Sequence, residues 1–334
     1  MFDADLLIAG GGPAGLATAL HALQSGLSVV IAEPRPHPID KACGEGLMPG
    51  GLAALARLGI DPPGVPFQGI AYLSGKRRAE ARFQHGPGRG VRRTALHAAL
   101  TGAAHERGAK WAAVRIDQIE QDATGVTAGG LRARWLVAAD GLHSTVRRRL
   151  GIAAVPGRPR RFGMRWHFST PAWSEFVEVW WSDRGEAYVT PVAPGQIGVA
   201  VLSSQKPDLA WFPALAERLG EPAAPRGAGP LRQVVRRRVA GRVLLVGDAA
   251  GYEDALTGEG ISLAVKQAQA AVEAIVAGRP QAYEHAWRGL TRDYRLLTRG
   301  LVLATRARAM RRAIVPICGL APAVFRGVVN ILAR

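Results

Sequence analysis

The first thirty residues alternate between continuous apolar runs and a stretch of helical periodicity. Ala4–Ala9 is a short apolar run bounded by glycine, which is typical of a buried parallel strand. From Pro13 to Ser25 apolar residues recur at helical spacing, and Gly26 stands where a helix C-cap belongs. Leu27–Ala32 is a second apolar run. The pattern predicts a β-α-β unit that closes within about 30 residues.

The middle of the chain shows the apolar–polar alternation of antiparallel strands. From about Arg161 to Leu202 this alternation predicts a meander, which holds four of the eight tryptophans. Shorter strands of a similar region are predicted at Ile70–Leu73 and Ala79–Phe83. Elements of the α/β kind are predicted between these two parts: helices at 52–58 and 94–107, a strand at 111–119, and a hairpin of 125–128 with 131–138.

Parallel-strand patterning returns at Arg242–Val246 and is followed by a helix from about Gly258 to Val276. The remainder is predicted to be helical and broken by Pro316 and Pro322. The chain is therefore predicted to contain an α/β nucleotide-binding domain made of three separated segments, with a sheet-rich region inserted between them. The predicted boundaries are 1–66, 85–155 and 236–285 for the α/β segments, 67–84 and 156–235 for the inserted sheet, and 286–334 for a basic helical region.

Composition narrows the class of protein. With 334 residues, 48% of them hydrophobic, and a mean hydropathy of +0.04, the chain is globular in character and long enough for more than one domain. No run approaches the roughly 20 apolar residues of a membrane span, and Asp3 and Asp5 replace the basic start of a signal peptide. Cys43 and Cys318 lie far apart without metal-type spacing, so we predict no metal and a cytoplasmic location.

The formal net charge of +17 indicates a candidate binding surface only near the end of the chain. Such a charge can indicate nucleic acid, anionic lipid or an acidic ligand. We predict no nucleic-acid binding, because the arginines are spread out and form no basic helix interleaved with aromatic residues. From Arg288 to Arg334, ten arginines accompany one acid, Asp293, and an uncharged run at Ala313–Phe325. This tail is either a weak contact to an anionic membrane surface or a helical cover with solvated arginines.

A glycine-rich turn joins the first predicted strand to the first predicted helix. The segment Gly10–Gly15 has the spacing GxGxxG, with Pro13 and Ala14 at the helix start. Gly10 permits the tight turn, Gly12 lets the backbone approach a pyrophosphate, and Gly15 lets helix and strand pack closely. Glu33 ends the second strand, where a carboxylate accepts hydrogen bonds from a ribose diol and disfavours a 2′-phosphate. This unit predicts a dinucleotide such as FAD or NAD.

Two later blocks place further polar groups after predicted strands. Asp140 and Gly141 follow the strand at 131–138, where they can organise a second contact near a pyrophosphate. Gly247 and Asp248 follow the strand at 242–246, so that the carboxylate can accept from sugar-chain hydroxyls. The segment Thr257–Ile261 then leaves backbone N–H groups free at a helix start, suited to negative charge on a reduced flavin.

Together the three blocks resemble the flavoprotein monooxygenase and geranylgeranyl-reductase superfamily, whose fold is like that of para-hydroxybenzoate hydroxylase. The resemblance extends to about residue 300. It implies an α/β fold in which a Rossmann-like FAD-binding domain of the glutathione-reductase type carries an inserted antiparallel β-sheet substrate domain and C-terminal helices. It also implies that Arg93, which opens an Arg-x-x-Leu-x-x-x-Leu helix, contacts the cofactor near its phosphates. The predicted cofactor contacts are Gly10, Gly12, Pro13, Ala14, Gly15, Glu33, Cys43, Gly44, Arg93, Asp140, Gly141, Gly247, Asp248, Gly258, Glu259, Gly260 and Ile261.

The segment Lys41–Leu47 looks like the Cys-Gly-Glu/Gly-Gly segment of geranylgeranyl-reductase-like proteins, which lies near the flavin in that family. Cys43 and Glu45 are therefore candidate neighbours of the reacting atoms, together with Tyr188, but no sequence feature marks Cys43 as a thiolate. His143 and His167 are weaker candidates for a general base, so the catalytic acid and base stay open. Ala255 stands where the family usually has proline.

Three functions remain open at this point. The first is an NAD(P)H-driven hydroxylase of an aromatic, phenolic or polyketide-type small molecule of secondary metabolism. The second is a reductase that saturates C=C bonds of a prenyl or lipid-like substrate; it is disfavoured because the family's Tyr-x-Trp-x-Phe-Pro motif appears only as the altered segment Glu186–Pro191. The third is a flavin-bearing electron-transfer protein. Without a second GxGxxG motif, NAD(P)H is expected to use a transient surface site or a partner reductase.

Overall fold

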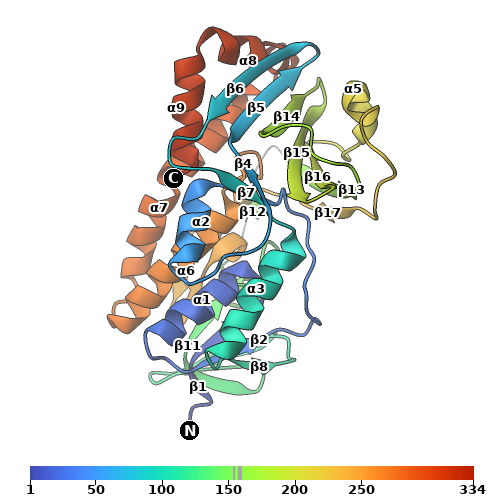
Figure 1. Ribbon diagram of the computed structural model, residues 1–334. Coiled ribbons are helices and arrows are strands. Elements are labelled where there is room, and N and C mark those ends of the chain that lie inside the picture. The colour runs from blue at the N-terminus through green and yellow to red at the C-terminus, as the bar shows by residue number, and fades with distance from the viewer. Residues whose placement is uncertain (153–154, 157–159) are drawn as a thin grey trace.

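The computed structural model describes residues 1–152, 155–156 and 160–334 and contains two large sheets (Figure 1). The first sheet lies toward the N-terminal end in Figure 1 and has eight strands, in the order β19-β20-β11-β1-β2-β8, with β10 and β9 following from β11 as a hairpin. Its strands are β1 (Ala4–Ala9), β2 (Val29–Ala32), β8 (Lys110–Ala112), β9 (Ile119–Gln121), β10 (Val126–Ala128), β11 (Leu131–Ala138), β19 (Val239–Ala240) and β20 (Val243–Leu245). The predicted single strand at 111–119 was wrong: it is two separate strands, β8 and β9.

The register of the first sheet brings three distant chain segments to one edge. Ala9 pairs with Ala138, and Ala138 pairs with Leu245, all in parallel strands. The carboxyl ends of β1, β11 and β20 therefore coincide, and each predicted cofactor motif begins directly after one of these ends. In an open parallel sheet this edge is where ligands bind.

Helices cover the first sheet because its strands are apolar on both faces. Leu6, Leu7 and Ile8 are fully buried, as the continuous apolar run predicts for a parallel strand. Helix α1 (Pro13–Gln24) packs between α3 (Arg93–Glu106) and α6 (Gly260–Val276). The shorter helices are α2 (Pro49–Ala56), α4 (Thr145–Arg149), α5 (Pro213–Ala216) and the 3-10 turns η1 (Leu209–Trp211) and η2 (Gly247–Ala250).

The second sheet has seven strands in the order β17-β13-β16-β15-β14-β5-β6. Its strands are β5 (Gly69–Ser74), β6 (Arg77–Arg82), β13 (Phe162–Phe168), β14 (Val177–Trp181), β15 (Gly185–Ala193), β16 (Gln196–Ser203) and β17 (Arg226–Ala228). The pairing is antiparallel, as predicted, except that β5 and β14 run parallel where the two inserted segments meet. Smaller sheets join β3 (Gly46–Leu47), β7 (Gly88–Gly90) and β4 (Val65–Phe67), and β12 (Val155–Pro156) with β18 (Gln233–Val234).

The C-terminal segment forms three helices: α7 (Ala282–Ala304), α8 (Arg308–Leu320) and α9 (Pro322–Leu332). The last two pack on β6 and cap the second sheet at the top of Figure 1. Pro322 begins α9, as expected of a residue that lacks a backbone N–H. The predicted break at Pro316 was wrong, because Pro316 lies inside α8.

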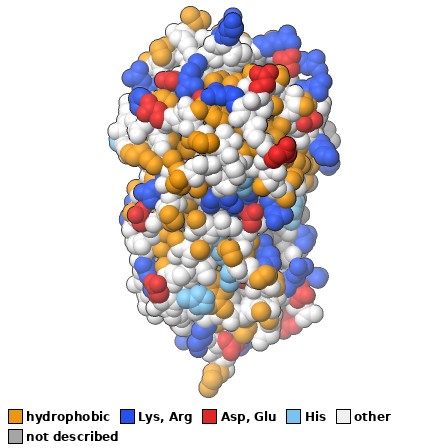
Figure 2. All heavy atoms as spheres, turned by 45° about the vertical axis from the view of Figure 1, so that its right-hand side comes forward, with side chains coloured by type: hydrophobic (Ala, Val, Ile, Leu, Met, Phe, Trp, Pro, Cys, Tyr) orange, Lys and Arg blue, Asp and Glu red, His pale blue; other side chains and the backbone are white. Residues whose placement is uncertain are grey.

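On the face shown in Figure 2, Lys and Arg side chains are interspersed with Asp and Glu over both halves of the molecule. The charge of this face is thus mixed, although the chain as a whole is strongly basic.

Candidate active site

A cavity of about 1110 Å³ extends from the ends of β1, β11 and β20 toward the second sheet and the C-terminal helices. One end is lined by glycines and polar groups of the predicted motifs, and the other end by aliphatic and aromatic side chains. The predicted site residues that line it are Gly12, Pro13, Ala14, Cys43, Gly44, Glu45, Arg93, Asp140, Gly141, His143, Tyr188, Gly247, Asp248, Gly258, Gly260 and Ile261. Four predicted contacts, Gly10, Gly15, Glu33 and Glu259, do not line it. The structure therefore brings most of the predicted site together.

The glycines of the first turn have different roles. A Cβ on Gly15 would lie 1.9 Å from the Gly10 carbonyl oxygen, and Gly10 itself has φ +105° against Ala139. These two glycines are required by the packing of the protein itself. Gly12, in contrast, has φ −76° and ψ 178°, which any residue adopts, and a Cβ there would meet nothing nearer than Arg93 Nη2 at 3.9 Å. Space beside Gly12 is therefore open, as close approach of a pyrophosphate requires.

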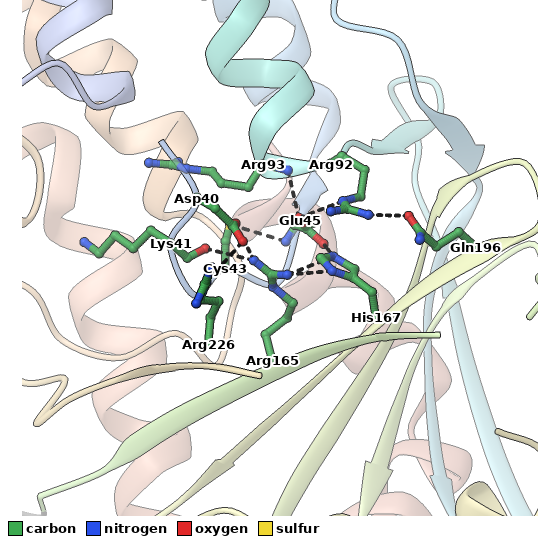
Figure 3. A network of polar contacts seen from close by, with 10 residues as sticks. All are labelled: Asp40, Lys41, Cys43, Glu45, Arg92, Arg93, Arg165, His167, Gln196 and Arg226. Carbon is green, nitrogen blue, oxygen red and sulfur yellow. Dashed lines mark hydrogen bonds and ion pairs between the residues drawn. The ribbon is translucent and has the colours of Figure 1, made fainter. Parts of the chain in front are cut away.

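Two polar side chains next to this open space have unsatisfied hydrogen-bonding groups. Asp140 Oδ2 accepts from the N–H groups of Thr145 (2.7 Å) and Val146 (3.0 Å), whereas the buried Oδ1 has no partner among the described residues. Arg93 is a buried residue whose Nε has no hydrogen-bond partner in the described part of the chain, and its side chain points away from Glu45 in Figure 3. Because buried polar groups are normally paired, both groups fit a bound ligand with anionic and hydroxyl oxygens.

Glu33 contacts the turn instead of the cavity. Its Oε2 accepts from the Gly11 N–H at 2.9 Å, and its two oxygens accept from Arg35 Nε and Nη2, each at 2.8 Å. On the opposite side, His97 Nε2 lies 2.9 Å from the Gly11 carbonyl oxygen. Burial lowers the pKa of His97 to about 4, so the ring is neutral and Nε2–H donates this bond. Sequence reasoning missed His97, although it lies one helical turn after Arg93.

The third motif places a carboxylate and glycine backbone against the same cavity. Gly247 (φ +59°) and Gly258 (φ +75°) adopt left-handed conformations that favour glycine. Asp248 Oδ2 pairs with Lys41 Nζ at 3.1 Å, which ties this motif to the loop that carries Cys43. Lys41 was not among the predicted contacts, and its only signal was its place beside the Cys-Gly-Glu segment.

Glu259 belongs to the third motif and is the N-cap residue of α6, but it does not line the cavity. Burial raises its pKa to about 8; Lys266 opposes this shift and Asp293 adds to it. Its Oε2 is buried with no partner among the described residues. A neutral carboxylic acid at this position is therefore the stable form near neutral pH.

We expect Glu259 to make the protein less stable as the pH rises. The pKa of Glu259 in the folded state, about 8, exceeds the ordinary value of 4.5. The contribution of Glu259 to the free energy of unfolding is therefore fully present below pH 4.5 and is lost as the pH rises through 8. The slope is on the order of 1.4 kcal/mol per pH unit inside this window. Urea unfolding at several pH values checks this, with Glu259→Gln as the control that removes the slope; equal slopes in both proteins would contradict it.

Glu45 is the centre of a buried network that joins three elements (Figure 3). It is 2% exposed and has a φ of +59°, unusual for a residue with a side chain. Its Oε1 accepts from the Arg93 N–H at 2.7 Å, which supplies an acidic cap to the first turn of α3. Its Oε2 lies 2.6 Å from His167 Nε2 on β13. The network thereby fixes the loop before β3 against both the α3 helix and the second sheet.

Arginine determines the tautomer of His167. Arg165 Nη1 lies 2.6 Å from His167 Nδ1 and can only donate, so Nδ1 is the acceptor and Nε2–H donates to Glu45. Arg165 Nη2 in turn donates to Asp40 Oδ1 at 2.5 Å. Burial would raise the pKa of Asp40, but the guanidinium charges of Arg165 and Arg226 outweigh it and lower that pKa. His167 thus has both ring nitrogens occupied, and it lies outside the cavity lining.

Cys43 lies in the cavity lining with its thiol protonated. Burial raises its pKa, against the opposing charge of Arg93. Its sulfur accepts from the Glu45 N–H at 3.3 Å. A protonated thiol disfavours a nucleophile, and the role of Cys43 as a neighbour of the reacting atoms stays a prediction.

The apolar end of the cavity combines the second sheet with the C-terminal helices. Tyr188 lines it and donates its hydroxyl to the Leu256 carbonyl at 2.9 Å, which holds the loop of the third motif. The remaining lining is dominated by side chains that sequence reasoning did not assign: Ile70, Tyr72, Val177, Val179, Ala200, Leu202, Leu231, Leu301, Ile314, Val324, Phe325, Val328 and Val329. The sequence shows that these positions are apolar and periodic, but it does not show that they line one common cavity. His143, also in the lining, contacts the Gly229 carbonyl oxygen at 3.1 Å.

Comparisons with known proteins agree with this geometry. A sequence model described as FAD binding domain matches residues 3–217. A menaquinone reductase of Mycolicibacterium smegmatis is 28% identical, covering 91% of this chain and 83% of the relative. A rifampicin monooxygenase of Streptomyces venezuelae is 28% identical over 79% of this chain and 62% of its own length. The solved structure of a flavin-dependent brominase, a Bmp2 triple mutant, superposes with a TM-score of 0.81 at 18% identity, covering 99% of this chain and 94% of that one, which shows the fold alone.

Proposed function

The chain belongs to the FAD binding domain family, and on that premise we propose that this FAD-dependent oxidoreductase is an NAD(P)H-driven monooxygenase of an apolar aromatic, phenolic or polyketide-type small molecule. One observation carries the proposal: a single cavity of about 1110 Å³ joins the cofactor motifs to an apolar chamber. A flavin ring and a substrate can therefore meet in one space shielded by protein.

The residues present fit FAD. Among the described residues, Asp140 Oδ1 and Arg93 Nε have no partner, and the space beside Gly12 is open; these three features match the demands of a pyrophosphate with its sugar groups. In this proposal Asp248 accepts from the ribityl chain, and the backbone at Gly258 to Ile261 lies beside the ring. When bound, FAD supplies the two-electron chemistry and the reaction with O₂.

The chain's own residues position the substrate and exclude water. Val177, Val179 and Leu202 present aliphatic surface toward the cavity, which favours a flat or extended apolar ligand. The Glu45 network holds the loop of Cys43 in place, and Tyr188 holds the loop at Leu256. We also propose that segments 1–66, 85–155 and 236–285 bind the cofactor, that 67–84 and 156–235 bind the substrate, and that the basic helical region 286–334 forms one wall of the chamber.

A second candidate is a reductase that saturates a C=C bond of a prenyl or lipid-like substrate. The depth of the apolar chamber, which continues from the second sheet to Val324 and Val328, favours a long flexible substrate. The relative named menaquinone reductase, matched over 91% of this chain, also supports it. The altered segment Glu186–Pro191 speaks against it. A cytoplasmic location, and contact of the basic C-terminal region with a membrane surface, belong to the proposal in either form.

Product analysis distinguishes the two candidates. The purified protein is incubated with NAD(P)H under ¹⁸O₂, once with a long-chain phenol and once with a prenylated quinone, and the products are weighed by mass spectrometry. Hydroxylation inserts one ¹⁸O atom and sends the other into water, while NAD(P)H loses two electrons and a proton. Saturation of a C=C bond adds two hydrogens and no ¹⁸O; because reduction of the quinone ring to the quinol also adds two hydrogens, products are reoxidised with ferricyanide before they are weighed, which returns the quinol to the quinone and leaves a saturated side chain two hydrogens heavier. A product carrying one ¹⁸O supports the monooxygenase. A product that is still heavier by two hydrogens after reoxidation would replace it by the reductase, and NAD(P)H oxidation without any such product would overturn both.

A further inference from the structure

The last two helices meet at an exposed apolar corner. No single helix in the described ranges is long and apolar enough to cross a membrane, but α8 and α9 together meet that criterion and are bent by 103°. Seven of the twelve large apolar side chains exposed in the described part of the chain lie between Leu296 and Ile331. At the corner, Leu320 is 87% exposed, Val324 66% and Ile317 47%. A gathering of this kind marks an interaction surface.

The exposed half of α8 is itself divided into two stripes. Met310, Ile317 and Leu320 lie seven and three residues apart, a spacing that places them along one side of the helix. Arg308 and Arg312 are one turn apart and form a neighbouring exposed stripe. An apolar stripe bordered by arginine is typical of a helix that lies in the interface of a bilayer.

The charge along α8 and α9 is mainly positive, with Asp183 as an ion-pair partner of Arg312 at the start of α8. Residues 294–334 contain eight arginines and no acid. At the first turn of α8, Arg306, Arg308 and Arg311 join Arg184 around a recess of about 550 Å³, whose one acidic member is Asp183. Phosphate oxygens of anionic lipid headgroups are complementary to such a recess, and the N-terminus of α8 adds to the positive potential.

The main cavity also comes to the surface at this corner, at the end opposite the cofactor motifs. Ile317 and Val324 line that cavity and are at the same time exposed. Behind them, Phe325 and Val329 of α9 continue the apolar lining toward the second sheet. A ligand passing between α8 and α9 thus meets only apolar side chains at the entrance.

We infer that the α8–α9 corner docks on an anionic lipid bilayer and that the cavity opens there, so that an apolar substrate enters directly from the bilayer. The apolar side chains at the corner insert, while the arginines at the start of α8 and on α9 contact headgroup phosphates. Insertion of apolar side chains and attraction of arginine to anionic headgroups both contribute to the affinity for the membrane, and each contribution alone is weak. The docking gives a location to the membrane contact included in the proposed function and does not depend on which reaction is catalysed, whereas the entry route rests on the proposed activity toward an apolar substrate.

Vesicle flotation with the FAD-loaded protein tests the docking. Phosphatidylglycerol and phosphatidylcholine vesicles are compared for the wild type, Leu320→Glu/Ile331→Glu, Arg308→Gln/Arg326→Gln, and the control Val276→Glu, an exposed apolar residue of α6. We expect the wild type and Val276→Glu to float with phosphatidylglycerol. The arginine variant should partition roughly 30-fold less and the Leu320 variant at least about 100-fold less, with unchanged FAD content.

Wild-type protein that floats no better with phosphatidylglycerol than without lipid would overturn the docking. Loss of a dimer in the Leu320 variant, without flotation of the wild type, would instead identify an interface between two copies.

A comparison of two activities separates this inference from the proposed function. The first is turnover of a prenylated quinone held in vesicles, and the second is turnover of a short detergent-soluble phenol. Loss of the first activity alone in the Leu320 variant supports entry from the bilayer. Flotation without turnover of either substrate would contradict the proposed function and would still support the docking.

Discussion

Gly12→Ala is expected to fold as stably as the wild type and to be isolated without FAD. Its φ and ψ suit alanine, and the added Cβ meets no protein atom nearer than 3.9 Å. The same Cβ occupies the space that the pyrophosphate needs, so FAD affinity should fall at least about 100-fold, equivalent to about 3 kcal/mol. FAD fluorescence titration measures the affinity, and thermal unfolding of FAD-free protein measures the stability.

Gly15→Ala is the matched comparison, because it alters the same motif for a different reason. A Cβ at this position lies 1.9 Å from the Gly10 carbonyl oxygen, so α1 and β1 must separate. We expect a loss of stability of about 3 kcal/mol together with loss of FAD. Gly102→Ala in α3, where a Cβ meets nothing within 4 Å, should be neutral or stabilising by about 1 kcal/mol. Normal FAD binding by Gly12→Ala would contradict the assignment of this turn.

The second large effect is expected at Glu45. Glu45→Ala leaves the Arg93 N–H and the His167 ring without their acceptor and retains a left-handed backbone that alanine disfavours. Removing one partner from a buried ionic network costs about 3–5 kcal/mol, so the midpoint of urea unfolding should fall strongly. Glu45→Gly should recover about 1 kcal/mol of this loss by relieving the backbone, and Glu45→Gln should lose least because it keeps an acceptor for Arg93.

A surface substitution and the flavin spectrum distinguish loss of the Glu45 network from a nonspecific loss of stability. Glu106→Ala removes an exposed carboxylate at the end of α3 and should change stability by less than about 0.5 kcal/mol. The visible spectrum of bound FAD should change in all three Glu45 variants, because the loop of Cys43 and Gly44 lines the cavity. Equal stabilities of the alanine and glycine variants would show that the φ of +59° stores no strain.

The first motif was predictable because its information is local. Strand, turn, helix and Glu33 follow one another within thirty residues, so spacing alone identifies the unit. The role of Glu33 was less accessible. That it accepts from Gly11 and Arg35 instead of lining the cavity depends on how the turn folds back, which periodicity does not encode.

The Glu45 network shows where sequence reasoning ends. Glu45 and His167 lie 122 residues apart, and no local pattern connects them. The left-handed backbone at Glu45 could not be inferred either, because glycine is the residue that normally signals it. Likewise the uncharged run at Ala313–Phe325 was visible in the sequence, but only the packing of α8 and α9 in the fold shows that they line the cavity.

The most direct test of the account is a titration of the FAD-loaded protein with a prenylated phenol, followed in the visible absorption of the flavin. If cofactor and substrate share the single cavity, the flavin bands shift saturably with one ligand per chain. If equilibrium dialysis shows binding of the phenol while the flavin spectrum stays unchanged, the apolar chamber is not the substrate site, and the account is contradicted.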